Sequence, residues 1–245
     1  MLAIIGGSGL TRLANLDVSR HESVDTPFGE PSGPLSLGAI RGVPVAFMAR
    51  HGEGHGIPPH KVNYRANLWA LREKGVREIV SVAAVGGIRD DLGPGTIVVP
   101  HQIIDYTWGR MNTYFEGEAP VKHVDFTEPY SERLRSRLLA AARACGESAV
   151  DGAVYAATQG PRLETAAEVD RLERDGADII GMTGMPEAAL AREIELDYAA
   201  IAVVANHAAG RGASARGVSL QDIEAVLNET LVRVRKIIEE VVARR

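Results

Sequence analysis

The sequence predicts an α/β fold, with residues 1–245 forming a single domain in which helices flank a central mixed β-sheet. From residue 62 onward, short uncharged apolar runs alternate with segments of helical periodicity. No internal repeat, low-complexity tract or linker divides the 245 residues, and this length suits one large domain. Both observations favour one sheet with helices on both faces.

The central strand is expected at residues 79–84, which are small or β-branched and carry no charge. Such a run is too short for a helix and too apolar for an exposed edge. Gly86 and Gly87 follow, and we expect a turn there that brings bare backbone N–H groups close to a ligand. Because ligands in open α/β sheets bind at the carboxyl ends of strands, the site is expected at this end.

The other elements follow from the same patterns. Further strands are expected at 2–5, 43–49, 96–99, 153–158, 178–182 and 198–205. Helices are expected at 62–74, 131–144, 164–174, 186–192 and 219–243. Gly75 and Gly146 follow the first two helices as stop signals, and Pro186 opens the fourth. Residues 25–38, rich in Pro and Gly, are expected to form a loop with short strand pieces.

Composition excludes several classes of partner. The formal net charge of −5 gives no basic surface for nucleic acid or anionic membranes. Cys145 stands alone, so neither an intramolecular disulfide nor a cysteine metal cluster is expected, and the location is expected to be cytoplasmic. The N-terminal apolar run is too short for a signal peptide, and no stretch reaches the length of a membrane span.

Residues 50–60 read RHGEGHGIPPH, a composition that first suggests a metal site. Regular ligand spacing needs a helix, which this glycine- and proline-rich run does not form, so we expect no metal. His55 is expected to be a solvated histidine on a mobile loop. Arg50 and His51 differ because they end the predicted strand 43–49, and a guanidinium matches the geometry of phosphate.

The segment IIGGSGL imitates two glycine motifs and satisfies neither. The dinucleotide fingerprint needs a third glycine where Arg12 stands, and the nucleophile elbow needs a glycine where Leu10 stands. The Ser8 hydroxyl and the exposed N–H groups of the glycine turn suit an anion. A purely structural turn explains this segment equally well.

Three more polar residues come at or near predicted strand ends, and each has a structural explanation of its own. Glu164 fits the first turn of a helix, Thr183 fits a helix cap, and Asn206 fits ordinary turn chemistry. Together they deliver polar groups to the ends of several strands. That arrangement favours a ligand site.

Six motifs, in order along nearly the whole chain, resemble the trimeric nucleoside phosphorylases, that is, purine nucleoside and methylthioadenosine phosphorylases. They are AIIGGSGL, DTPFGEPS, ARHGEGHGIPPHKVNYRANLWAL, AAVGGI, QGPRLET and GMTGMPEAALARE. The resemblance implies the nucleoside phosphorylase fold, a homotrimer, inorganic phosphate as co-substrate and no cofactor. It assigns the phosphate site to Ser8, Arg50, His51, Thr183 and the backbone N–H of Ala84.

The resemblance also implies a nucleoside pocket. Met182 matches the family position beneath the ribose, and His123 matches a histidine that reaches the active site of the neighbouring subunit. The other residues assigned to the pocket are Ala83, Gly86, Leu163, Leu220 and Ile223. The catalytic assignments fall on Glu164 and Asn206, as groups that hold the departing purine.

The base pocket departs from methylthioadenosine phosphorylase, which has Ser at the Glu164 position and Asp at the positions of Asn206 and Ala208. Glu and Asn at the first two positions are instead typical of 6-oxopurine phosphorylases. An ionised Glu164 only accepts hydrogen bonds, so it pairs with N1–H of hypoxanthine, whereas adenine N1 is a bare acceptor. Asn206 donates toward O6 and N7 but does not discriminate by itself. A buried mismatch of this kind changes the rate by roughly 10⁴-fold.

Leu220 and Ile223 place apolar side chains where oxopurine phosphorylases have a histidine near the 5′-hydroxyl. An apolar wall suits a methylthio group and leaves a hydroxyl unpaired. We therefore expect phosphorolysis of S-methyl-5′-thioinosine to hypoxanthine and 5-methylthioribose 1-phosphate, with phosphate attacking C1′. The alternatives are a general phosphorylase for inosine and guanosine, a methylthioadenosine phosphorylase that tolerates Glu164, and a nucleoside-binding protein without catalysis.

Overall fold

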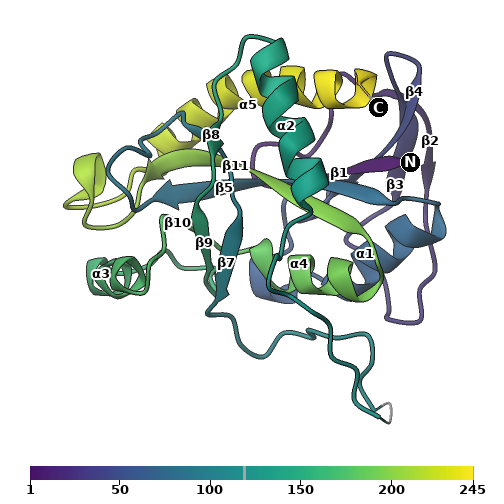
Figure 1. Cartoon of the computed structure of the whole chain (residues 1–245), viewed down its shortest axis with the longest axis horizontal. Coiled ribbons are helices and arrows are strands. Elements are labelled where there is room, and N and C mark those ends of the chain that lie inside the picture. Colours follow the sequence, from purple (N-terminus) through teal and green to yellow (C-terminus); the bar gives the residue numbers. More distant parts are fainter. Residues whose placement is uncertain (118–119, 245) are drawn as a thin grey trace.

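The computed structural model describes residues 1–117 and 120–244 and confirms the predicted α/β fold (Figure 1). The strands of the mixed sheet are β1 (Leu2–Gly6), β2 (Asp17–Glu22), β3 (Leu35–Ile40), β4 (Val43–Ala49), β5 (Glu78–Gly87), β6 (Ile97–Val99), β7 (Gln102–Asp105), β8 (Val150–Asp151), β9 (Val154–Ala157), β10 (Ile179–Gly181) and β11 (Asp197–His207). The helices are α1 (Tyr64–Glu73), α2 (Glu132–Ala144), α3 (Ala166–Arg174), α4 (Gly184–Glu193) and α5 (Leu220–Ala243), with 3₁₀ turns at Pro59–Lys61 and Gly212–Ser214.

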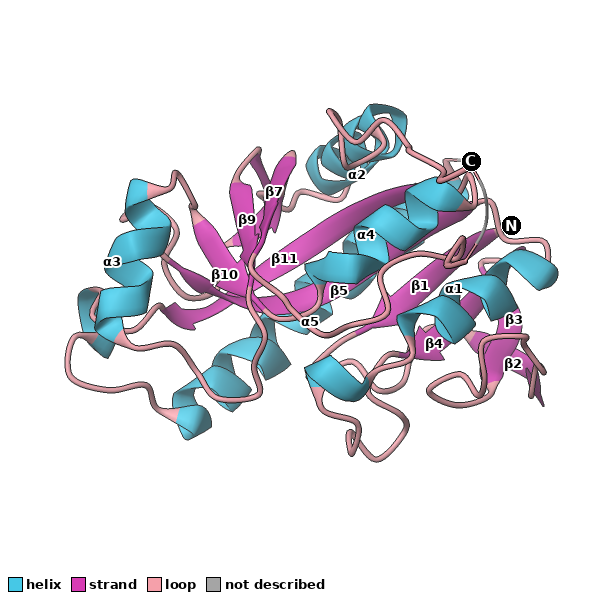
Figure 2. Ribbon diagram, turned by 90° about the horizontal axis from the view of Figure 1, so that it is seen from below, coloured by secondary structure: helices cyan, strands magenta, loops and turns pink. Residues whose placement is uncertain are grey.

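Helices cover both faces of the sheet. In Figure 1, α2 and α5 lie above the sheet and α1 and α4 lie below it; Figure 2 shows the second pair in front of the strands. Leu134 of α2 and Leu231 of α5 belong to one buried apolar cluster, and Leu68 of α1 and Leu190 of α4 belong to another. Since both faces are covered, the central strands β5 and β11 consist almost wholly of buried residues.

Strand β5 has a gap along one of its edges. On the other edge, β11 runs parallel to it over the whole length, from Glu78 to Gly87. On the gapped edge, β1 pairs with β5 only as far as Ser81, and β10 pairs with it only at Gly86 and Gly87. Among the described residues, no strand pairs with positions 82–85 on that edge. Backbone groups of a central strand are therefore open to a ligand there.

The predicted turn at Gly86 and Gly87 is wrong, because both glycines continue β5. A Cβ at Gly87 would lie 1.9 Å from the carbonyl oxygen of Leu92, and one at Gly86 would lie 3.3 Å from Cα of Ala208. The glycines are needed for close approach of neighbouring backbone and not for a turn.

The region 25–38 forms a loop that leads into strand β3, in agreement with the predicted loop with short strand pieces, and β3 pairs with β2 in a hairpin. Strand β2 is largely exposed, so its sequence lacks the apolar alternation by which strands are recognised. The strands β7 and β8 were not predicted, because they are too short to show a periodic pattern. In the described part of the chain, no helix is both long and apolar enough to cross a membrane.

Candidate active site

A cavity of about 480 Å³ opens along the gapped edge of β5. This volume lies within the range of small-molecule pockets. All of the predicted site residues except His123 line it, namely Ser8, Arg50, His51, Ala83, Ala84, Gly86, Leu163, Glu164, Met182, Thr183, Asn206, Leu220 and Ile223. Residues from seven separate segments thus meet at one site.

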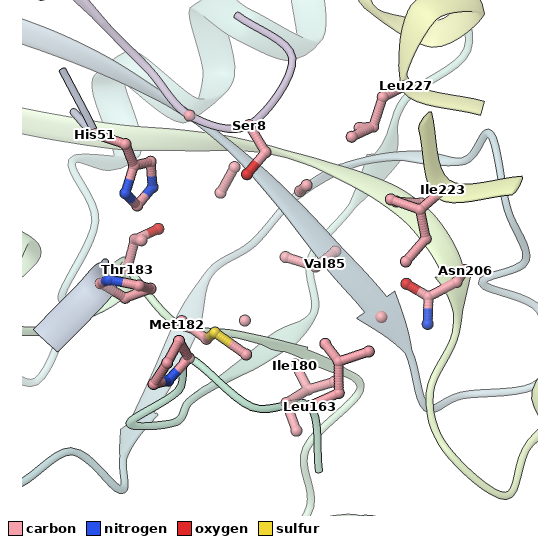
Figure 3. A pocket seen from close by; sticks show the side chains of 18 of the residues that line it. Ser8, His51, Val85, Leu163, Ile180, Met182, Thr183, Asn206, Ile223 and Leu227 are labelled. Carbon is pink, nitrogen blue, oxygen red and sulfur yellow. The ribbon is translucent and has the colours of Figure 1, made fainter. Parts of the chain in front are cut away.

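Figure 3 shows that the lining is divided into two ends. Ser8, His51 and Thr183 lie at one end, and Leu163 and Asn206 lie at the other. The first end offers a hydroxyl, an imidazole and a second hydroxyl, the groups that bind an anion. The second end combines an apolar side chain with an amide, which suits the face and the edge of a planar base.

Arg50 is fully buried at the polar end, and its charge is paired. Its Nε and Nη2 donate to the Glu187 carboxylate at 2.7 and 2.9 Å, Nη2 also donates to Ser81 Oγ at 2.6 Å, and Nη1 donates to the Val82 carbonyl at 3.1 Å. Burial alone lowers the pKa of Arg50, but the charge and hydrogen bonds of Glu187 outweigh it and raise the pKa above its ordinary value. Nη1 retains one further N–H, and it faces the glycine turn: a Cβ at Gly7 would lie only 2.9 Å from it.

The backbone N–H of Ala84 faces the same space. The Val82 carbonyl points to the gapped edge of β5, since it accepts from Arg50 there and would lie 2.7 Å from a Cβ at Gly7. In a strand the N–H and C=O of one residue share an edge, and residues two apart share that edge. The N–H of Ala84 therefore points into the gap, where β5 has no partner strand.

His51 is held in one tautomer beside Arg50. Its Nδ1 lies 2.8 Å from the Ile57 carbonyl oxygen, so Nδ1 carries the proton and Nε2 is the acceptor. Burial first, and then the charge of Arg50, lower the pKa of His51 to about 4. A neutral His51 with a bare Nε2 suits the O–H of monohydrogen phosphate.

We expect His51 to make stability depend on pH between about 4 and 6.5. In the unfolded chain the imidazole takes up a proton as the pH falls below about 6.5, whereas the folded protein resists it until about 4. The stability that the neutral His51 contributes is therefore fully present above pH 6.5. It is lost as the pH falls toward 4, which lowers the free energy of unfolding by roughly 3 kcal/mol. Urea unfolding of wild type and His51→Asn across this range measures the loss. Parallel curves for the two proteins would contradict it.

His55 is exposed, as predicted, but it also lies beside the glycine turn. Its Nε2 lies 3.4 Å from Ser8 Oγ, its ring centroid lies 4.7 Å from that of His51, and it lines the cavity. The residue has a φ of +52°, in the left-handed region, so the loop turns its side chain back toward the glycine turn. Nothing in the local sequence signals this contact, because the two loops are 47 residues apart.

Thr183 is buried immediately before α4, and its side chain makes no capping hydrogen bond. Met185 has extended dihedral angles, so regular helix begins at Pro186, as the sequence predicts. Thr183 lines the polar end of the cavity, where its hydroxyl also lies within hydrogen-bonding reach of Tyr155. Met182 lies along the cavity floor beside Thr183 in Figure 3.

Glu164 lies outside the helix that it was predicted to open. Helix α3 begins at Ala166, and Thr165 is its N-cap. Glu168 completes the capping box by accepting from the Thr165 N–H at 2.7 Å, and it also pairs with Arg162. Because another carboxylate serves the helix N-terminus, the Glu164 carboxylate is available to the cavity that it lines.

Asn206 enters the cavity at a β-bulge. The register of β11 against β5 shifts between Val204 and Asn206, which places Asn206 opposite Gly86. Its Nδ2 donates to the His207 carbonyl at 2.6 Å, which leaves a second N–H and Oδ1 for a ligand. The edge of a purine base can form hydrogen bonds with both groups.

The apolar wall comes mainly from the first turns of α5. Leu220 is 71% exposed at the mouth of the cavity, whereas Ile223 is half-buried and Leu227 is 5% exposed. Both Ile223 and Leu227 point into the cavity in Figure 3. Leu227 was missed, although its spacing of four residues from Ile223 puts it on the same helix face.

His123 lies outside the cavity, on the exposed segment between β7 and α2. Its assignment to the site of a neighbouring subunit stays a prediction. Among residues 1–117 and 120–244, no group of three or more His, Cys, Asp or Glu is placed to hold a metal ion. The expectation that catalysis needs neither metal nor cofactor likewise stays a prediction.

Residues 1–243 match the sequence model of the Phosphorylase superfamily. The chain belongs to this family. It is 56% identical over 212 residues to a probable S-methyl-5′-thioinosine phosphorylase from Xanthomonas campestris pv. campestris, covering 86% of this chain and 85% of that one. It is 47% identical over 215 residues to the 6-oxopurine nucleoside phosphorylase of Pyrococcus furiosus, covering 85% and 80%.

Solved structures give the same family at the level of the fold. Methylthioadenosine phosphorylase from Schistosoma mansoni, in complex with adenine, superposes with a TM-score of 0.93 at 36% identity. The match covers 99% of this chain and 90% of that one.

Proposed function

We propose that this enzyme cleaves S-methyl-5′-thioinosine with inorganic phosphate and releases hypoxanthine and 5-methylthioribose 1-phosphate. The coarser activity follows from the family and the relatives: the chain is a purine nucleoside phosphorylase, a pentosyltransferase. The observation that carries the choice of base is the Glu164 carboxylate, left free by the capping box and lining the same cavity as Asn206.

The base end supports a 6-oxopurine on chemical grounds. A carboxylate accepts the N1–H of hypoxanthine, and the remaining N–H of Asn206 donates toward O6 or N7. Adenine would place its bare N1 against the carboxylate oxygens. Two acceptors then face each other with no proton between them, which disfavours adenine.

The apolar wall from α5 supports a methylthio group at the 5′ position of the sugar. Ile223 and Leu227 have no polar atoms in their side chains and line the wall beside Asn206 (Figure 3). A 5′-hydroxyl against this wall would lose its hydrogen bond to water without a replacement, whereas a methylthio group buries apolar surface. The relative from X. campestris bears the name of a methylthioinosine enzyme, in agreement with this argument.

The reaction that we propose needs only positioning and charge stabilisation. Phosphate, held by Arg50, His51 and the Ala84 N–H, attacks C1′ while the glycosidic bond breaks through a cationic, oxocarbenium-like sugar. The departing purine takes the bonding electrons. A hydrogen bond from Asn206 near N7 stabilises its negative charge. Glu164 holds the base in place by accepting its N1–H.

We also propose that the enzyme is a cytoplasmic homotrimer. The segment between β7 and α2 extends beyond α1 and α4 in Figure 1 and carries His123. Two exposed apolar side chains precede that histidine in the same segment: Trp108 is 72% exposed and Val121 is 70% exposed. Such apolar exposure on a projecting segment is typical of a surface that another subunit covers. Leu163 and Leu220, at the mouth of the cavity, are also exposed.

Phosphate-dependent cleavage of methylthioinosine, inosine and methylthioadenosine, measured side by side, tests the proposal. We expect methylthioinosine to have the highest kcat/KM, with hypoxanthine as the released base and no release without phosphate. Equal or faster cleavage of inosine would make the protein a general oxopurine phosphorylase. Faster cleavage of methylthioadenosine would reject the argument from Glu164, and absence of cleavage would leave a binding protein.

A further inference from the structure

Thr158 occupies a rigid position behind the base end of the cavity. It directly follows β9, which pairs with β10 (Figure 2). Its N–H donates to the Gly181 carbonyl at 2.8 Å, and its own carbonyl accepts from Nη2 of the nearly buried Arg110 at 3.2 Å. The backbone of Thr158 is thus fixed from both sides.

The Thr158 hydroxyl has one proton and two acceptors within reach. Glu164 Oε1 lies at 2.6 Å and the Gly181 carbonyl oxygen at 3.3 Å. The Gly181 oxygen already accepts the Thr158 N–H, and a hydrogen bond to a carboxylate is shorter and stronger than one to a neutral carbonyl. The hydroxyl proton therefore goes to Glu164.

Glu164 depends on this hydrogen bond for its orientation. Arg162, two residues away, directs both terminal nitrogens of its guanidinium to Glu168, at 2.7 and 2.8 Å. Within the described residues, Thr158 is the only side chain or backbone group that donates a hydrogen bond to the Glu164 carboxylate. The distal oxygen, Oε2, is left for the purine.

We infer that Thr158 is a positioning residue that sets base selectivity by fixing the Glu164 carboxylate. The inference rests on the proposed function. With Oε1 occupied by the hydroxyl, Oε2 is presented to the base edge as a fixed acceptor, which attracts N1–H of a 6-oxopurine and repels the bare N1 of adenine. Without the hydroxyl, the carboxylate turns freely. The attraction and the repulsion then both weaken. The ratio of kcat/KM for the 6-oxopurine substrate to that for the adenine substrate therefore falls, because the first value decreases and the second increases.

Thr158→Val tests this inference because valine keeps the β-branched shape and removes only the hydroxyl. We expect the ratio of kcat/KM for methylthioinosine to that for methylthioadenosine to fall about tenfold, as for loss of a hydrogen bond to a charged group. The KM for phosphate should not change. Thr158→Ser keeps the hydroxyl and should therefore keep the wild-type ratio. Ser136→Ala removes the same kind of bond, from Ser136 Oγ to Glu132 Oε1 at 3.0 Å on α2, away from the cavity and from the segment that carries His123, and should leave the ratio unchanged.

The outcomes separate this inference from the proposed function. If wild type prefers methylthioinosine and Thr158→Val keeps the same ratio, the inference alone is wrong. An equal fall for both substrates, or a raised KM for phosphate, would indicate a merely structural role and would also overturn it. If wild type prefers methylthioadenosine, the proposed function fails and the inference fails with it.

Discussion

Replacing Glu187 with Ala should lower the free energy of unfolding by about 3–5 kcal/mol and abolish most phosphate-dependent activity. The change leaves the fully buried Arg50 guanidinium without its counter-charge, at a position where its side chain is 1% exposed. Tyr198 and Ser81, which also donate to Glu187 at 2.7 and 2.9 Å, would lose their acceptor. Denaturant unfolding measures the stability, and the KM for phosphate reports whether Arg50 still faces the cavity.

A double variant separates folding from binding. Replacing both charges with apolar side chains, as in Arg50→Met with Glu187→Leu, removes the unpaired buried charge and should recover much of the stability. It should not recover activity, since no guanidinium remains for phosphate. Glu168→Ala serves as the surface control, with an expected loss of only about 1 kcal/mol from the capping box. If Glu187→Ala were no more destabilising than Glu168→Ala, the buried pair would not have the role assigned to it.

Glu164→Gln should remove most of the preference for hypoxanthine over adenine as the released base, an effect of up to roughly 10⁴-fold in the ratio of kcat/KM. The glutamine amide both accepts and donates, so it pairs with N1–H of hypoxanthine through its oxygen and with bare N1 of adenine through its nitrogen. The measurement is the kcat/KM for methylthioinosine and for methylthioadenosine in the same phosphate buffer.

Glu168→Gln is the matched control for the loss of a carboxylate. Glu168 lies four residues further on, but its side chain caps α3 and does not line the cavity. Its replacement should leave the selectivity ratio near the wild-type value. An unchanged ratio for Glu164→Gln would show that the base is chosen elsewhere in the pocket.

Much of the fold could be predicted because its signals are local. The uncharged runs that become β5 and β11 and the apolar face of α5 are properties of a few consecutive residues. The strand-end residues Arg50 and Asn206 were found for the same reason. Where a strand is exposed, as in β2, the local signal is weak and the sequence did not reveal it.

The residues that orient the site could not be predicted in the same way. Arg50 and Glu187 are 137 positions apart, and Ser8 and His55 are 47 apart, so no spacing along the chain links them. Thr158 is only six residues from Glu164, yet its part depends on which carboxylate caps α3 and on where β10 lies.

The sequence by itself thus determined the α/β class, most of the strands and helices, and the chemical identities of the groups that line the cavity. Only the tertiary structure decided which carboxylate is free, which histidine faces Ser8, and that β5 lies unpaired at 82–85, between β1 and β10. The physical reason is that propensity and periodicity act over a few residues. Hydrogen bonds between distant segments, in contrast, depend on how the whole sheet and its helices pack.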